Sequence, residues 1–170
     1  EVWLPPGPWV DWNTGERHHG GRAIDVEAPL GTTPLFVRGG AALFLAEPAR
    51  NAEETLRGSL ALELTMPPPG AVGHGSLFLD DGESAAGARY MLDVAVANVP
   101  RGLRVRLTRT ADSFLPAQHD LELRAPRAYS SVYVDGECRE LAQLRLAAED
   151  RSAVVMTARV PFAARELLLT

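Results

Sequence analysis

The sequence predicts an all-β protein whose main part is an antiparallel β-sandwich. The first observation is the strict alternation of apolar and polar residues in several short segments. The second is the presence of turn-forming residues between these segments at intervals of about ten residues. The third is the weakness of any helical periodicity. Strands of this kind bury one face and expose the other, and two sheets of them pack face to face around a common core.

The first 45 residues differ in composition from the rest of the chain. The turn signals PPGP, NTG and HHGG alternate there with short apolar pieces, and all three tryptophans, Trp3, Trp9 and Trp12, lie among them. Tryptophans in such a segment could form a flat platform for sugars, or be buried against another domain, and burial is favoured. We expect residues 1–48 to be the remainder of one small β-domain and residues 49–170 to form a second β-sandwich.

The second part of the chain carries most of the strand signals. AEETLRGS at 52–59 predicts one or two helical turns that stop at Gly58. LALELTM at 60–66 and LRVRLTRT at 103–110 each predict a strand with leucine or valine on one face. Further strands are expected in HDLELRAP, in SVYVDGE, which enters an Asp-Gly turn, and in SAVVMTARV. ELAQLRLAAED at 140–150 fits both periods, and strand is favoured there.

LFLDDGES at 77–84 places three carboxylates, those of Asp80, Asp81 and Glu83, within four positions. Many glycosidases work with a pair of carboxylates. Asp-Gly is also a strong turn signal, and the β-rich ARYMLDVAV follows after a short gap. Solvated carboxylates at such a tip lack the surroundings that separate an acid from a base, and the spacing supplies too few ligands for calcium. We therefore expect Asp80, Asp81 and Gly82 to form a structural turn.

The histidines and the single cysteine give no stronger site. His18 and His19 are expected in a solvated loop, and adjacent side chains of an extended chain do not readily share a metal. His74 lies between glycines and is expected in a loop, while His119 begins a strand beside an aspartate. Cys138 alone permits neither an internal disulfide nor a CxxC metal site. No catalytic, cofactor-binding or metal-binding residue is predicted.

Composition excludes two classes of partner. The chain has 170 residues and a formal net charge of -5, with no basic cluster, which argues against binding to nucleic acid. No apolar run reaches the ~18 residues that a membrane-spanning helix needs. No signal peptide is visible, and a cytoplasmic location is favoured.

Two stretches of the chain carry a recognisable pattern. The second is LFLDDGES, and the first contains Trp3, Leu4, Pro5, Gly7, Trp9, Asp11, Trp12, Thr14, Gly15, Glu16, Gly20, Gly21, Val26, Ala28, Pro29, Leu30, Pro34, Phe36, Val37, Arg38 and Gly39. Together they resemble the region after the catalytic barrel in glycoside hydrolase family 31, which comprises α-glucosidases, α-xylosidases and their relatives, and Trp3 stands where that family usually has tyrosine. The two stretches anchor roughly the first 90 residues, and the rest agrees only in being β-rich.

The resemblance implies an architecture in which a (β/α)8 barrel precedes a proximal and then a distal β-sandwich. Residues 1–48 would then complete the proximal sandwich, and residues 49–170 would be the distal one. The barrel, with the family's two catalytic aspartates, would lie upstream of Glu1, so no catalytic role passes to Asp80 or Asp81. The expected partner is the barrel of the parent chain, and Trp3, Trp9, Trp12 and Phe36 are expected to face it.

Two functions from different classes follow. The first is a non-catalytic C-terminal β-domain piece of a retaining α-glycosidase, which braces the barrel. The second is an accessory carbohydrate-binding module, for which exposed aromatic rings are needed. The distal half supplies only Phe78, Tyr90, Phe114, Tyr129, Tyr133 and Phe162, and no tryptophan. This favours the first function, and an exposed coplanar pair of aromatic rings would favour the second.

Overall fold

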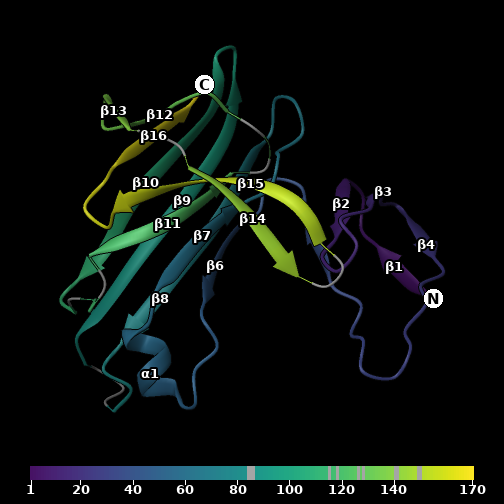
Figure 1. Cartoon of the computed structure of the whole chain (residues 1–170), viewed down its shortest axis with the longest axis horizontal. Coiled ribbons are helices and arrows are strands. Elements are labelled where there is room, and N and C mark those ends of the chain that lie inside the picture. Colours follow the sequence, from purple (N-terminus) through teal and green to yellow (C-terminus); the bar gives the residue numbers. More distant parts are fainter. Residues whose placement is uncertain are drawn as a thin grey trace.

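Two β-sheets packed face to face form most of the molecule, and a smaller group of short strands from the N-terminal residues lies beside them (Figure 1). The computed structural model describes residues 1–83, 87–114, 116–117, 119–125, 127, 129–139, 142–148 and 151–170. Within these ranges it does not describe the side chains of residues 56, 142–148 and 151–156.

The first sheet of the sandwich has six strands and is antiparallel throughout. Their order is β13 (Glu137–Arg139), β12 (Val132–Val134), β16 (Glu166–Leu169), β10 (Gly102–Asp112), β9 (Arg89–Val99) and β8 (Val72–Asp80). β8, β9 and β10 follow one another along the chain as a meander. Between β12 and β13 the chain turns through Asp135 and Gly136, which both have positive φ, as the Asp-Gly signal in SVYVDGE predicts.

The second sheet has five strands. Their order is β14 (Ala142–Ala148), β15 (Arg151–Pro161), β11 (Asp120–Ala125), β7 (Leu60–Leu64) and β6 (Ala42–Ala46). All neighbours are antiparallel except β7 and β11, which run parallel. The chain makes β8, β9 and β10 in the other sheet between these two strands, which gives the long connection that a parallel pair needs. The predicted all-β sandwich is confirmed.

The core between the sheets comes from the alternating segments. β7 buries its three leucines, and β10 buries Leu103, Val105 and Leu107 while Arg104 and Arg106 are exposed. The partners that β9, β11 and β16 contribute are equally buried, at 0–1% exposure: Leu92, Val94, Val96, Leu121, Leu123, Leu167 and Leu169. Every residue of this buried cluster lies at or after Ala42. The sandwich therefore has a core of its own.

The helix and the ambiguous segment both follow the expectations. α1 (Ala52–Arg57) begins after Asn51, whose side-chain oxygen accepts a hydrogen bond from the Glu54 N–H at 2.9 Å, and it ends at Gly58. Among the described residues no helix has the length and apolarity needed to cross a membrane. Residues 142–148 of the ambiguous segment form strand β14, and its residues 140, 141, 149 and 150 lie outside the described ranges.

The N-terminal strands form two small sheets. β1 (Val2–Leu4) pairs with β4 (Arg22–Ile24), and β2 (Pro8–Asp11) lies between β3 (Arg17–His19) and β5 (Phe36–Arg38). Of residues 1–41 only Leu4, Asp11 and Gly40 are buried. We call residues 1–38 the N-terminal module; unlike the sandwich, it has almost no core.

The strands of the sandwich begin before the expected boundary at residues 48 and 49. β6 pairs with β7 in the second sheet, with Phe44 opposite Leu62, although residues 42–46 fall within the range expected for the first domain. The change of composition near EPARNAEE corresponds to the segment around α1, which connects two strands of one sheet. The module joins the sandwich just before β6, where the Thr65 hydroxyl donates to the Arg38 carbonyl oxygen at 2.8 Å.

Candidate functional site

The carboxylates of LFLDDGES lie in an exposed connection between two antiparallel strands. β8 ends at Asp80 and β9 begins at Arg89, which is the cross-strand partner of Asp80. One carboxylate oxygen of Asp80 accepts from the Gly82 N–H at 3.0 Å, and one of Asp81 accepts from the Glu83 N–H at 3.1 Å. Gly82 has a φ of 72°. Both aspartates thus order their own backbone, as is usual for Asx turns.

Three of the predicted interface residues lie in the small three-stranded sheet or next to it. Trp9 and Asp11 are two residues apart on β2 and so share one face of this sheet. His18 on β3 is opposite Trp9, and Phe36 on β5 is opposite Asp11, so these side chains lie on the same face. The rings of His18 and Phe36 meet edge to face, with centroids 5.6 Å apart. Trp12 follows β2 directly and is partly buried, and its backbone N–H donates to the Leu35 carbonyl oxygen at 2.7 Å.

Trp3 lies apart from these residues, in the two-stranded sheet opposite Ala23, and 63% of its surface is exposed. Leu30 and Leu35, in the segment between β4 and β5, are exposed by 106% and 48%. Three of the five large apolar residues that the described chain exposes therefore belong to the N-terminal module. Periodicity does not identify Leu30 and Leu35, because they lie outside regular strands.

Hydrogen bonds between side chains and backbone take the place of a core in the module. The indole N–H of Trp9 donates to the Pro5 carbonyl oxygen at 2.7 Å. The carboxylate of Asp11, 8% exposed, accepts from the N–H groups of Asn13 at 2.8 Å and Thr14 at 3.0 Å. Buried carboxylates need such partners. The sequence pattern contains Asp11 but does not indicate that its carboxylate binds these backbone N–H groups.

The predicted loop positions of three histidines were wrong. His18 and His19 lie in strand β3 and not in a loop, with His18 partly buried against Phe36 and His19 exposed. His74 also lies in a strand, β8, because the glycines on either side of it face the interior. Cys138 is exposed on β13. Within the described ranges no group of three His, Cys, Asp or Glu side chains has the proximity needed to hold a metal ion.

The sequence and the fold both match known proteins. Residues 1–43 match the model of the glycosyl hydrolase family 31 C-terminal domain. The chain is 40% identical over 99 residues to an α-xylosidase from Saccharolobus solfataricus, which covers 55% of this chain and 13% of that protein. It is 37% identical over 78 residues to an α-glucosidase from Aspergillus niger, which covers 45% of this chain and 8% of that protein.

The solved structures extend the likeness to the full chain at the level of the fold. A family 31 dextranase from Flavobacterium johnsoniae, in complex with isomaltotriose, superposes with a TM-score of 0.81 at 19% identity, over 99% of this chain and 24% of that one. A family 31 α-xylosidase from Xanthomonas citri gives 0.65 at 22% identity, over 99% and 17%. The chain resembles the C-terminal region of glycoside hydrolase family 31 enzymes, in sequence over its first part and in fold over its full length. The resemblance read from the sequence is confirmed.

The chain spans 13% or less of the length of these two curated relatives. Its distal aromatic residues show one exposed ring. Phe78 is 54% exposed, Tyr133 is partly buried, Phe114 packs against the core, and Tyr90, Tyr129 and Phe162 are buried. The one aromatic pair described in the sandwich joins Tyr90 and Phe162, which are both buried. The described residues thus contain no exposed coplanar pair of rings.

Proposed function

We propose that the chain is the non-catalytic C-terminal β-domain region of a retaining α-glycosidase of the α-glucosidase or α-xylosidase type. Its N-terminal module docks against the catalytic barrel of the parent chain and fixes the sandwich to it. The observation that supports this function most directly is the imbalance between exposed and buried apolar residues in the module.

The imbalance has a simple physical meaning. A unit of roughly 40 residues rarely folds alone without disulfides, metals or a partner surface. The module exposes Trp3, Leu30 and Leu35 and buries Leu4 as its only large apolar side chain. An apolar surface that covered the three exposed residues would add the hydrophobic stabilisation that the module itself lacks. Trp9, Trp12 and Phe36, which are partly buried, would complete the docking surface.

We also propose that the chain consists of two units. Their junction lies at residues 39–41 and not at 48 and 49, because β6 belongs to the second sheet of the sandwich. Gly40 fits closely there: a Cβ at this position would lie 3.0 Å from the Gly73 Cα and 3.1 Å from the Pro67 Cβ. The sandwich would then carry the distal unit, with the core described above.

The non-catalytic character can be tested with the chain as it stands. Aryl α-glucoside and aryl α-xyloside substrates should release nothing above background, since Asp80 and Asp81 are used as turn caps in an exposed connection. Substitutions Asp80→Asn and Asp81→Asn should leave that background unchanged, as should the control Asp25→Asn on an exposed loop. Turnover that disappears with Asp80→Asn or Asp81→Asn, and not with Asp25→Asn, would show that the chain is itself a glycosidase.

A further inference from the structure

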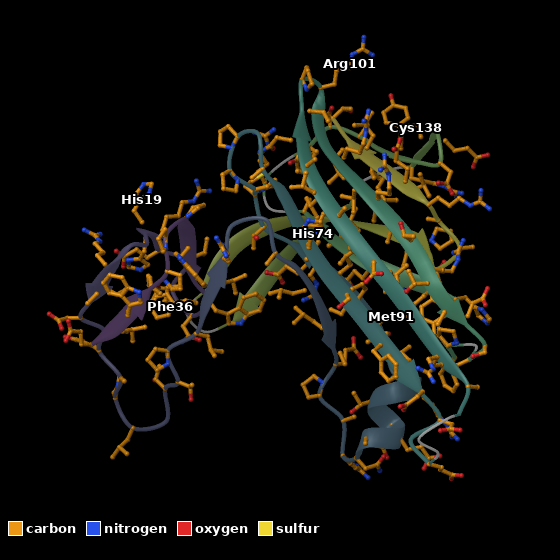
Figure 2. All side chains as sticks on the ribbon, turned by 180° about the vertical axis from the view of Figure 1, so that it is seen from behind. His19, Phe36, His74, Met91, Arg101 and Cys138 are labelled. Carbon is orange, nitrogen blue, oxygen red and sulfur yellow. The ribbon has the colours of Figure 1, made fainter. Side chains whose placement is uncertain are left out.

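A hollow of about 310 Å³ lies in the outer face of the six-stranded sheet, over β8, β9 and β10. Ser76 on β8, Asp93 on β9 and Thr108 on β10 form one row across it, because each is the cross-strand partner of the next. His74, Ala95 and Arg106 form the neighbouring row in the same way. Figure 2 shows this face of the sheet, with His74 and Met91 labelled on it.

The pattern of β8 explains why polar groups line the hollow. A Cβ at Gly73 would lie 1.9 Å from the Gly40 carbonyl oxygen, and one at Gly75 would lie 2.0 Å from that of Ala42. Both glycines therefore face inward against the backbone that leads into β6. The side chains of His74 and Ser76, which alternate with them, must face outward. Ala95, the middle residue of the His74 row, is too small to fill the space.

The polar side chains around the hollow are almost uncommitted. In the described part of the chain, the side chains of His74, Ser76, Arg106 and Thr108 make neither a hydrogen bond nor an ion pair. Asp93 has one weak partner, since it accepts from the Thr110 hydroxyl at 3.4 Å. The lining thus offers hydroxyl and imidazole groups that can donate or accept and a carboxylate that accepts, and Arg106 just beyond it adds a guanidinium that donates.

An apolar surface adjoins this polar rim. Phe78, 54% exposed, lies opposite Met91 on the outer face, one row beyond Ser76 and Asp93. A small-molecule site needs this combination of a few convergent polar groups that fix orientation and an apolar surface that supplies contact area. The volume lies at the lower end of the usual range for such sites, about 300–1000 Å³.

We infer that this hollow is a binding site for a neutral saccharide unit, whose hydroxyl groups meet His74, Ser76, Asp93 and Thr108 and whose C–H face packs on Phe78. Asp93 is the one carboxylate of the lining, and Arg106 lies just beyond the lining, next to Ala95 in the neighbouring row, so neither sign of charge dominates around the hollow. A compact, uncharged ligand with both donors and acceptors at its edge matches this rim. The site is independent of the docking proposal, because the N-terminal module contributes no residue to it.

The test is a titration of the full chain, labelled with 15N, with isomaltotriose, maltotriose and xylose, and with glycerol as a polyol control. At least one saccharide should bind with millimolar affinity, and its chemical-shift changes should be confined to residues 74–78, 91–95 and 106–108. Asp93→Ala and Phe78→Ala should each weaken binding about tenfold or more, because they remove a charged acceptor and the packing surface. Asp93→Asn, which keeps the shape of the side chain, should weaken it as well.

Two control variants separate this site from general surface effects. Asp25→Ala and Leu30→Ala change residues of the same kinds that are exposed in the N-terminal module, and both should bind the saccharide as the unaltered chain does. The proposal is overturned if no saccharide shifts the residues of the hollow, if glycerol shifts them equally, or if the Asp93 and Phe78 variants bind unchanged. None of these results bears on the docking surface, which is tested separately.

Discussion

Trp9 donates its indole N–H to the Pro5 carbonyl oxygen at 2.7 Å, and Gly20 lies directly against this contact. A Cβ at Gly20 would be 1.8 Å from the Pro5 oxygen and 2.8 Å from the Trp9 indole nitrogen. The Gly20 N–H also donates to the Gly7 carbonyl oxygen at 2.8 Å. The connection from β1 to β2 and the turn between β3 and β4 therefore meet at a point where only glycine fits, and the module depends on this contact because it has almost no core.

Substitution Gly20→Ala should destabilise the module by about 1–3 kcal/mol, since the backbone must move and the Trp9 hydrogen bond is lost. All three tryptophans lie in the module, so thermal unfolding followed by tryptophan fluorescence reports on it selectively. Far-ultraviolet circular dichroism reports mainly on the sandwich, whose transition should stay in place.

The control for this variant is Gly15→Ala, where no atom lies within 4 Å of the new Cβ and only the positive φ of 76° carries a cost. It should lower the fluorescence transition less than Gly20→Ala does. An equal effect of the two substitutions would show that the contact between Gly20 and Pro5 is unimportant.

Gly82→Val should lower the free energy of unfolding of the sandwich by about 1 kcal/mol or more, because a β-branched residue is strained at a φ of 72°. Denaturant unfolding followed by circular dichroism measures this. Gly82→Asn is the matched control, since asparagine tolerates the left-handed region, and it should be close to neutral. If valine and asparagine are equally tolerated, the turn does not depend on that conformation.

The hydroxyl of Tyr90 is buried and has no hydrogen-bond partner of acceptable geometry in the described part of the chain. Burial raises the pKa of this phenol, the positive charge of Arg109 lowers it in part, and burial prevails. Arg109 acts through its charge, and its guanidinium donates to the Phe162 carbonyl oxygen at 2.9 Å. Arg109 thus lies near the phenol without making a hydrogen bond of good geometry to it.

Tyr90→Phe should therefore be neutral or stabilising near pH 7, because it removes an unpaired buried polar group and keeps the ring that packs on Phe162.

The folded-state pKa of Tyr90 lies above the unfolded value of 10.0, so the contribution of Tyr90 to stability is complete below pH 10 and is lost as pH rises toward the folded pKa. Denaturant midpoints measured from pH 8 to pH 11 should fall less steeply for Tyr90→Phe than for the unaltered chain. Tyr133→Phe, on the outer face of β12, should fall as the unaltered chain does. A free energy of unfolding at pH 7 that is more than about 1 kcal/mol lower for Tyr90→Phe than for the unaltered chain would mean that the hydroxyl is paired.

Strands whose pattern is local were predictable from the sequence. Leu103, Val105 and Leu107 alternate with polar residues, and that alone determines which side of β10 is buried. α1 was likewise predictable, from its composition and from Gly58 at its end.

Features that depend on distant segments were not predictable in this way. The strand around His74 was not predicted, because Gly73 and Gly75 signal a loop. These glycines are needed because the backbone of Gly40 and Ala42, 30 or more residues earlier in the chain, leaves no room for a side chain at either position. The parallel pairing of β7 with β11 is equally invisible to local periodicity. The hollow over Asp93 is formed by three strands together, so no single segment of the sequence indicates it.

Sedimentation velocity of the full chain and of a chain that begins at Gly40 tests the docking surface most directly. The shorter chain keeps every residue of the buried cluster and should fold and sediment as a monomer. The full chain should self-associate, because Trp3, Leu30 and Leu35 are exposed and the short strands of the module leave open edges. A variant with Leu30→Ser and Leu35→Ser should return it to a monomer, whereas the matched variant with Val72→Ser and Phe78→Ser on the sandwich should not. If the full chain is instead a monomer whose tryptophans are shielded from acrylamide quenching, the module needs no partner and the proposed docking function is wrong.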